Sequence, residues 1–192
     1  MSSVTTKRFT LDEYHHLIEL GFLTEDDRVE LIRGELVQMA AKGTSHSVCN
    51  TKLVRELERL IGDRAVIRPQ EPIILPADSE PEPDIVIAQG QPDDYLSNHP
   101  HPTDILLVIE VSDSTTKYDQ TTKLSLYASR QIQDYWIVNL VATQLERYSQ
   151  PYQDRQGNFG YRVKQISLQN ETVTLPNFSD LSIDLNRVFP GS

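Results

Sequence analysis

Hydrophobic residues recur along the chain at two spacings, one typical of helices and one typical of strands. Residues 9–21, FTLDEYHHLIELG, carry the first of these patterns. Thr10 followed by Glu13 forms a capping box at the start of this segment, and Gly21 is a residue that ends helices. The segment is therefore predicted to be a helix, in which the adjacent His15 and His16 point to different faces and do not share a metal.

A second helix is predicted between Gly43 and Gly62. The apolar positions that recur there at helical spacing are Cys49, Leu53, Leu57 and Leu60. Thr44 or Ser45 is expected to cap the start, and Gly62 to close the end. His46 lies on the inward side near the start, where a packed or capping histidine is favoured over a metal ligand.

Strand-like alternation follows in residues 28–39, RVELIRGELVQM. Arg33 and Gly34 are suited to a two-residue hairpin turn. That turn would place Glu30 opposite Val37 and beside Ile32, an acid among apolar neighbours. Alternatively, this side of the hairpin is exposed to solvent.

Further strands are predicted in the middle of the chain. Residues 104–111, DILLVIEV, are continuously apolar up to Glu110, which is typical of a strand buried on both faces. Residues 134–139, DYWIVN, have the same character. In the proline-rich stretch 69–102, PIIL (72–75) and DIVIA (84–88) are expected to be short strands between loops.

The remaining segments complete the expected order. Residues 117–132 have a helical pattern, residues 144–150 and 160–166 alternate like an antiparallel pair, and the tail is expected to hold a strand and a short helix. Helices and strands mixed in this way predict an α/β or α+β sandwich, with a central mixed sheet flanked by helices. We expect one domain over residues 1–192, with a core at about 10–150 and C-terminal strands and tail at 151–192.

Composition narrows the class of protein. The net charge is −10 and the isoelectric point about 4.9, whereas proteins that hold nucleic acid by charge alone are usually basic. Nucleic-acid binding would therefore need a local site or a dimer surface. No run approaches the roughly 18 apolar residues of a membrane span, and the N-terminal residues lack the apolar centre of a signal peptide. The single cysteine, Cys49, excludes an internal disulfide and fits a cytoplasmic location.

Two acids at the edges of predicted buried strands are the candidates for chemistry. Asp84 opens DIVIA, and Glu110 nearly closes DILLVIEV. Burying a carboxylate without a partner is costly, so a cation side chain or a metal should compensate them. Mg²⁺ takes carboxylate and carbonyl oxygens, and the two acids with the carbonyl of Val111 would form such a site. The next lysines along the chain, Lys117 and Lys123, are the candidates for a compensating cation side chain.

Each of these residues also has a possible structural role. Lys123 could pair with Asp119 on the surface of the helix, Asp84 could cap a turn, and Glu110 could be structural. His99 and His101 are spaced for a metal, but nothing nearby completes a set of ligands.

Several segments together resemble a known family. Pro83-Asp84 followed by IEVS (109–112) is similar to the PD-(D/E)xK nuclease pattern, although Ser112 stands where that pattern has lysine. VELIRGELV, EPDIVIA, LLVIEVSDSTTKYDQTTKLSLYA and YWIVN resemble the Uma2 family (DUF820) of restriction-type endonucleases, which is abundant in cyanobacteria. The resemblance implies that the catalytic lysine has moved to the next helix, at Lys123 in DQTTKL, and that Glu30 is a further acid near the metal. Asn139 stands where many members have aspartate.

The resemblance implies a restriction-endonuclease-like core and a Mg²⁺-dependent endonuclease, with Mn²⁺ able to substitute and DNA favoured over RNA. A homodimer is expected, because two sites related by symmetry suit the cleavage of both strands of a duplex. Asp84 and Glu110 would bind the metal, and Lys123 would stabilise the transition state. A binding or assembly module with little or no catalysis is the main alternative. A hydrolase of a small phosphodiester is a third.

Overall fold

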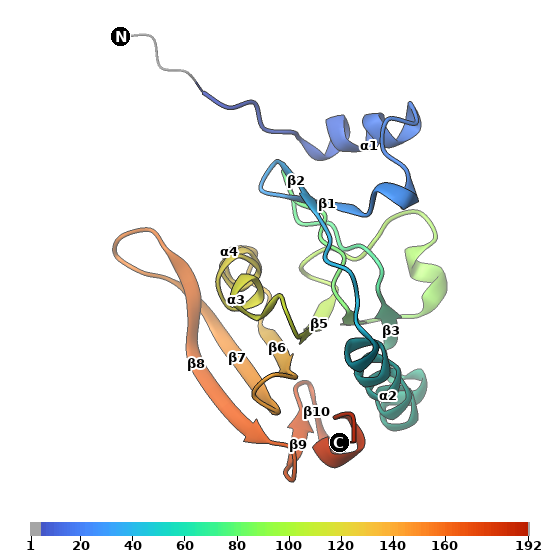
Figure 1. Ribbon diagram of the computed structural model, residues 1–192, viewed down its shortest axis with the longest axis vertical. Coiled ribbons are helices and arrows are strands. Elements are labelled where there is room, and N and C mark those ends of the chain that lie inside the picture. Colours follow the sequence, from blue (N-terminus) through green and yellow to red (C-terminus); the bar gives the residue numbers. More distant parts are fainter. Residues whose placement is uncertain (1–4, 192) are drawn as a thin grey trace.

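Within residues 5–191, ten strands make up about half of the regular structure (Figure 1). The computed structural model describes residues 5–191, apart from the side chain of Glu25. The strands are β1 (Val29–Ile32), β2 (Glu35–Gln38), β3 (Val66–Pro69), β4 (Ile85–Ala88), β5 (Ile105–Ser112), β6 (Asp134–Asn139), β7 (Gln144–Gln153), β8 (Phe159–Leu168), β9 (Thr172–Leu175) and β10 (Phe178–Asp184).

The helices lie between these strands. They are α1 (Leu11–Glu19), α2 (Thr44–Ile61), α3 (Thr116–Tyr118), a π-helical turn η4 (Asp119–Lys123) and α4 (Leu124–Ser129). Short 3₁₀ turns occupy Glu25–Asp27, Gly62–Arg64, Pro92–Tyr95 and Leu185–Arg187. Because α3, η4 and α4 follow one another without a break, they form one helical run over residues 116–129.

The central sheet has six strands in the order β3-β4-β5-β6-β7-β8. Strands β5 and β6 are parallel, and every other neighbouring pair is antiparallel. The helical run supplies the crossover that a parallel pair requires. This architecture confirms the predicted mixed sheet flanked by helices.

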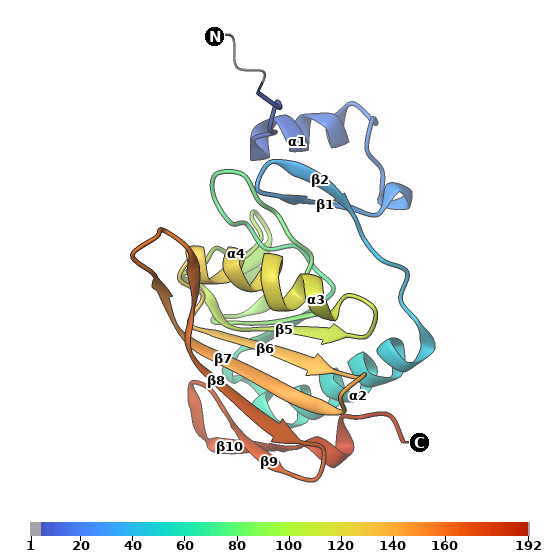
Figure 2. The same cartoon turned by 60° about the vertical axis from the view of Figure 1, so that its left-hand side comes forward.

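Both faces of the sheet are covered, which explains the apolar character of β5 (Figure 2). On one face, α2 and the β9–β10 hairpin pack against the sheet, with Leu53 and Leu57 in the same cluster as Ile109 and Trp136. On the other face lie α4 and the β1–β2 hairpin. The residues of that second cluster include Ile32, Val108, Leu126, Tyr127 and Tyr135. The prediction of a strand buried on both faces is confirmed.

The β1–β2 hairpin and the first helix have the predicted geometry. Glu30 pairs with Val37 across the hairpin, and the turn falls at Arg33-Gly34. Thr10 and Glu13 form both bonds of the capping box. The N-cap expected for the second helix was wrong, because Gly43 occupies that position without a side-chain bond.

The proline-rich stretch differs from its prediction. PIIL is not a strand, because its N–H groups bond to separate loops: Ile73 to the carbonyl of Pro81, and Ile74 to that of Pro100. Prolines on both sides leave too little chain for a ladder. Strand β4 pairs with β5 on one side and with β3 on the other, and β3 was not predicted from the sequence.

Two further predictions about the secondary structure were wrong. The helix predicted over 117–132 covers 116–129 and contains the π-helical turn. The tail forms a two-stranded hairpin, β9 and β10, rather than a single strand before its short helix. This hairpin shares the core beneath α2.

A buried carboxylate links the helical run to the far strands of the sheet. Glu146, on β7, is 1% exposed. Its donors are Gln120, Asn139, Gln144, Tyr148 and Lys164. Burial opposes ionisation, but the bonds from Lys164 and Tyr148 lower the pKa of Glu146 to about 2. Asn139 therefore serves this network at the end of β6.

Replacing Glu146 with glutamine should lower the free energy of unfolding in a pH-dependent way. The lowered pKa means that the ionised carboxylate stabilises the fold above pH 4.5, its unfolded value, and that this contribution is lost as the pH falls toward about 2. The difference between wild type and Glu146→Gln, measured by urea unfolding, should be constant above about pH 5 and shrink below it. A difference that stays the same down to about pH 2.5 would contradict this account.

Candidate active site

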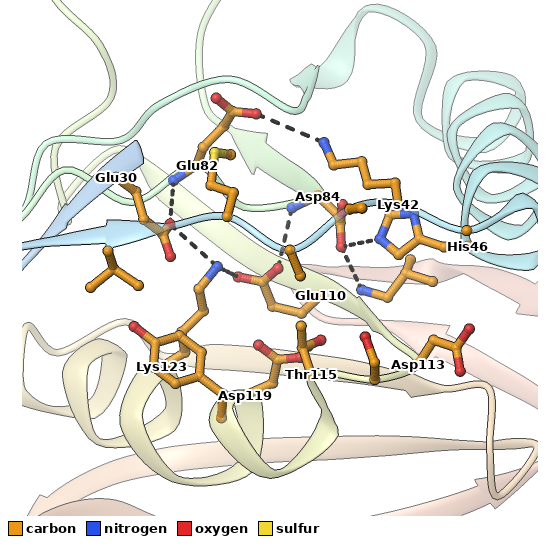
Figure 3. A pocket seen from close by; sticks show the side chains of 18 of the residues that line it. Glu30, Lys42, His46, Glu82, Asp84, Glu110, Asp113, Thr115, Asp119 and Lys123 are labelled. Atoms are coloured by element: carbon orange, nitrogen blue, oxygen red, sulfur yellow. Dashed lines mark hydrogen bonds and ion pairs between the residues drawn. The ribbon is translucent and has the colours of Figure 1, made fainter. Parts of the chain in front are cut away.

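A cleft of about 450 Å³ opens where the β1–β2 hairpin, the start of β4, the end of β5 and the turn η4 converge (Figure 3). Six acids line it: Glu30, Glu82, Asp84, Glu110, Asp113 and Asp119. Two lysines, Lys42 and Lys123, also line the cleft. The excess of carboxylates makes the cleft a favourable place for a cation.

Asp84 is oriented by two donors on one of its oxygens. Its Oδ2 accepts the backbone N–H of Val111 and lies 2.9 Å from His46 Nε2, which also donates because the carboxylate only accepts. Burial acts against the charge, but the bond from His46 and the N–H of Val111 lower the pKa of Asp84. The possibility that Asp84 merely caps a turn is therefore wrong.

Glu110 is held in a similar way by donors from the helical run. Its Oε1 accepts bonds from Lys123 Nζ at 3.0 Å and from the Tyr127 hydroxyl at 2.8 Å. Its Oε2 receives a longer contact of 3.4 Å from the backbone N–H of Asp84. Complete burial raises the pKa of Glu110, and the charge of Lys123 opposes that shift.

Lys123 compensates two acids at once. Its ammonium also lies 3.5 Å from Glu30 Oε2, and that oxygen accepts the backbone N–H of Glu82. Although burial works against it, the charges of Glu110 and Glu30 raise the pKa of Lys123, so the ammonium stays protonated. Lys117 is exposed and lies outside the cleft.

The structure thus brings together all four predicted site residues: Glu30, Asp84, Glu110 and Lys123. The alternative in which Lys123 pairs with Asp119 is wrong. Asp119 Oδ2 instead accepts the hydroxyls of Ser112 at 2.6 Å and Thr115 at 2.7 Å.

Asp119 fixes how the helical run leaves the sheet. The bond from Ser112 joins the first residue of η4 to the end of β5, two positions beyond Glu110, and the bond from Thr115 ties it to the residue before α3. The π-helical turn then carries Lys123 inward, where it is 7% exposed. Such turns are rare in proteins overall, but those that occur are often found at functional sites.

Two residues of this arrangement were missed by sequence reasoning. His46 was interpreted as a packed or capping residue, and Asp119 only as a possible surface partner of Lys123. The inward position of His46 in the first turn of α2 was the available signal. No sequence signal indicates the bond between Asp119 and Ser112.

The donor set fits a hard divalent cation. Each acid has one oxygen fixed by strong donors, which leaves Asp84 Oδ1 and Glu110 Oε2 as the less committed oxygens of the two acids. Within residues 5–191, no group of three or more His, Cys, Asp or Glu side chains is arranged to hold a metal. Mg²⁺ does not need such a cage, because it is commonly bound by one or two carboxylates, waters and substrate phosphates.

Comparison with known proteins agrees with this fold. Residues 11–186 match the Uma2 family model, described as "Putative restriction endonuclease", and the chain belongs to that family. Among solved structures, it is similar to a "putative nuclease belonging to DUF820" from Anabaena variabilis ATCC 29413. The two share 16% identity with a TM-score of 0.71, over 94% of this chain and 97% of the other. No curated protein matches the chain.

Within residues 5–191, no helix has both the length and the apolar character needed to cross a membrane.

Replacing Lys123 with methionine should destabilise the fold. The substitution keeps the aliphatic stem but leaves Glu110 and Glu30 buried without a counter-charge, for which we expect a loss of about 3 kcal/mol in the free energy of unfolding. Adding Glu30→Gln should restore part of that loss, since one of the two acids becomes neutral. Urea unfolding of the single and double variants tests both steps, and unchanged stability of Lys123→Met would show that the ammonium does not compensate these acids.

Proposed function

We propose that the protein is a Mg²⁺-dependent endonuclease that hydrolyses phosphodiester bonds in nucleic acid, with DNA as its substrate. The observation that carries this proposal is the convergence of Asp84, Glu110 and Lys123 in one cleft, with one less committed oxygen on each acid. Membership of the Uma2 family supports the same reaction class.

Asp84 Oδ1 and Glu110 Oε2 would hold the metal, together with the main-chain carbonyl of Val111. The N–H of Val111 already orients Asp84, so this residue would serve the site through both of its backbone groups. When bound, the metal would supply a water of lowered pKa and polarise a phosphoryl oxygen. Mn²⁺ should substitute, because it accepts the same oxygen ligands.

Lys123 would stabilise the negative charge that grows on the phosphoryl group and orient the attacking water. A fixed cation inside a desolvated cleft is effective in this role because no reorganisation is needed during the reaction. Glu30 assists as a second acid beside the ammonium, in addition to Glu110. Tyr127 completes the support of Glu110 through its hydroxyl.

The charge of the whole chain restricts how a nucleic acid can bind. A net charge of −10 repels a polyanion at long range, so the binding energy must come from the cleft and the metal. A homodimer would place two symmetry-related clefts on the two strands of a duplex, and we propose this assembly for the active protein. The cytoplasmic location of the protein stays a prediction from the sequence.

A second candidate function is a binding or assembly module with a nuclease-like fold. One observation favours it: both lysines of the cleft already face acids, Lys123 facing Glu110 and Glu30, and Lys42 facing Glu82 at 3.9 Å. Metal binding separates the two candidates, since only the endonuclease requires it.

Lys123→Met should abolish Mg²⁺-dependent plasmid cleavage, with a loss of at least about a hundredfold expected for a transition-state contact. The matched control is Lys117→Met, which changes an exposed lysine on the same helical run and should cleave as wild type does. The assay follows nicking and linearisation of supercoiled plasmid at a temperature where circular dichroism shows both variants folded. Equal activity of Lys123→Met and wild type would remove the proposed role of this lysine.

Asp84→Asn should weaken Mn²⁺ binding by at least about tenfold, because one of two carboxylate ligands becomes neutral. Isothermal calorimetry on the folded proteins measures this directly, with the exposed Asp93→Asn as a control that should bind as wild type does. If folded wild-type protein binds no Mn²⁺ or Mg²⁺ at millimolar concentration, the binding-module function is favoured.

A further inference from the structure

Lys42 lines the cleft from the loop between β2 and α2, and the chemistry proposed above does not use it. Its side chain is 27% exposed, whereas Lys123 is buried. Lysine side chains cover their aliphatic stems and keep the charged end in water, so the exposed part is expected to be the ammonium. A ligand that enters the cleft from solvent can therefore reach this charge.

The ammonium of Lys42 has only a loose partner. It points toward the carboxylate of Glu82 at 3.9 Å, which is longer than a hydrogen bond (Figure 3). Both side chains are partly exposed, and ion pairs of this kind contribute little to stability. Lys123, in contrast, donates a 3.0 Å bond to Glu110 in a buried position. Lys42 can leave its partner at small cost, whereas Lys123 is fixed.

Glu82 connects Lys42 to the proposed metal site. It precedes Asp84 by two residues, and its backbone N–H donates to Glu30 Oε2. Burial raises the pKa of Glu82, and the charges of Lys42 and Lys123 oppose that shift. Both lysines thus act on the same carboxylate, which stands two residues from a proposed metal ligand.

A nucleic acid that enters this cleft brings a row of phosphates toward six acids. Each phosphate that a lysine neutralises adds to the binding free energy through the release of counterions. An ammonium binds phosphate as a point charge with three rotatable donors, so it needs no exact geometry. Lys42 has the exposure and the freedom to transfer its charge from a carboxylate to a phosphate.

We propose that Lys42 is a substrate-binding residue whose ammonium leaves Glu82 and contacts a non-bridging oxygen of a backbone phosphate of the nucleic acid. This assignment rests on the proposed endonuclease function and adds a phosphate-binding residue to it. The contact forms when the substrate binds, so it contributes to affinity rather than to the chemical step. The alternative is that Lys42 only neutralises Glu82, in which case no phosphate depends on it.

Lys42→Met removes the charge and keeps the aliphatic stem. We expect the affinity for a fluorescein-labelled DNA duplex, measured by anisotropy with Ca²⁺ in place of Mg²⁺, to fall about tenfold, as for a lost bond to a charged group. The slope of log affinity against log salt concentration should become shallower by about 0.9, the value for one phosphate contact. In cleavage assays KM should rise while kcat stays close to wild type. The melting temperature should be unchanged, because the pair with Glu82 is weak.

Lys117→Met is the matched control. It changes the net charge by the same amount at an exposed position outside the cleft. Its duplex affinity and salt slope should equal those of wild type. An equal loss in both variants would assign the effect to net charge and overturn the inference.

The double variant Lys42→Met/Glu82→Gln separates phosphate contact from neutralisation of Glu82. If Lys42 contacts a phosphate, the double variant still lacks that contact and should keep the shallower slope. If Lys42 only neutralises Glu82, removing both charges should restore the affinity and slope of wild type, which would overturn the inference.

The outcomes also distinguish this inference from the proposed function. Lys42→Met with the salt slope of wild type, whatever its affinity, overturns the inference and leaves the endonuclease standing. Wild-type protein that binds the duplex but does not cleave it in Mg²⁺, with a shallower slope in Lys42→Met, supports the phosphate contact while the endonuclease fails. Wild-type protein that neither binds nor cleaves removes both.

Discussion

The ammonium of Lys123 lies between two buried carboxylates, 3.0 Å from Glu110 Oε1 and 3.5 Å from Glu30 Oε2. These residues come from a hairpin, a central strand and a helix, so one contact joins three segments that are distant in sequence. Burying either acid there without a counter-charge would be costly, because its other hydrogen bonds would not offset the desolvation. The position of the β1–β2 hairpin above the sheet and the inward course of the π-helical turn both depend on this compensation.

Under the proposed function, the same contact would prepare the cleft to bind a metal. It uses one oxygen of Glu110, while His46 and the N–H of Val111 use one oxygen of Asp84. The remaining oxygens belong to a cleft that carries more acids than lysines. A divalent cation would relieve that excess of charge, and a phosphate would then be attracted to a protein that is acidic overall. In this way, a local site can serve a nucleic acid that the net charge of the chain repels.

The sequence predicted the parts that depend on local pattern. The alternation of VELIRGELV was enough to pair Glu30 with Val37, and the continuous run before Glu110 was enough to predict a strand buried on both faces. Prediction failed where partners are distant in sequence. PIIL has the composition of a strand, but its N–H groups bond to separate loops, and the strand beside β4 is Val66–Pro69. The resemblance pointed to Lys123, whereas the π-helical turn and the bond between His46 and Asp84 are tertiary features that no spacing encodes.

The most direct test of the account is the anomalous scattering of Mn²⁺ in crystals soaked at millimolar concentration. We predict a peak in contact with both Asp84 and Glu110, with the ammonium of Lys123 still beside Glu110 on the opposite oxygen. A metal bound elsewhere in the protein, or no metal between these two carboxylates, would contradict the central claim that they form the metal site of a nuclease.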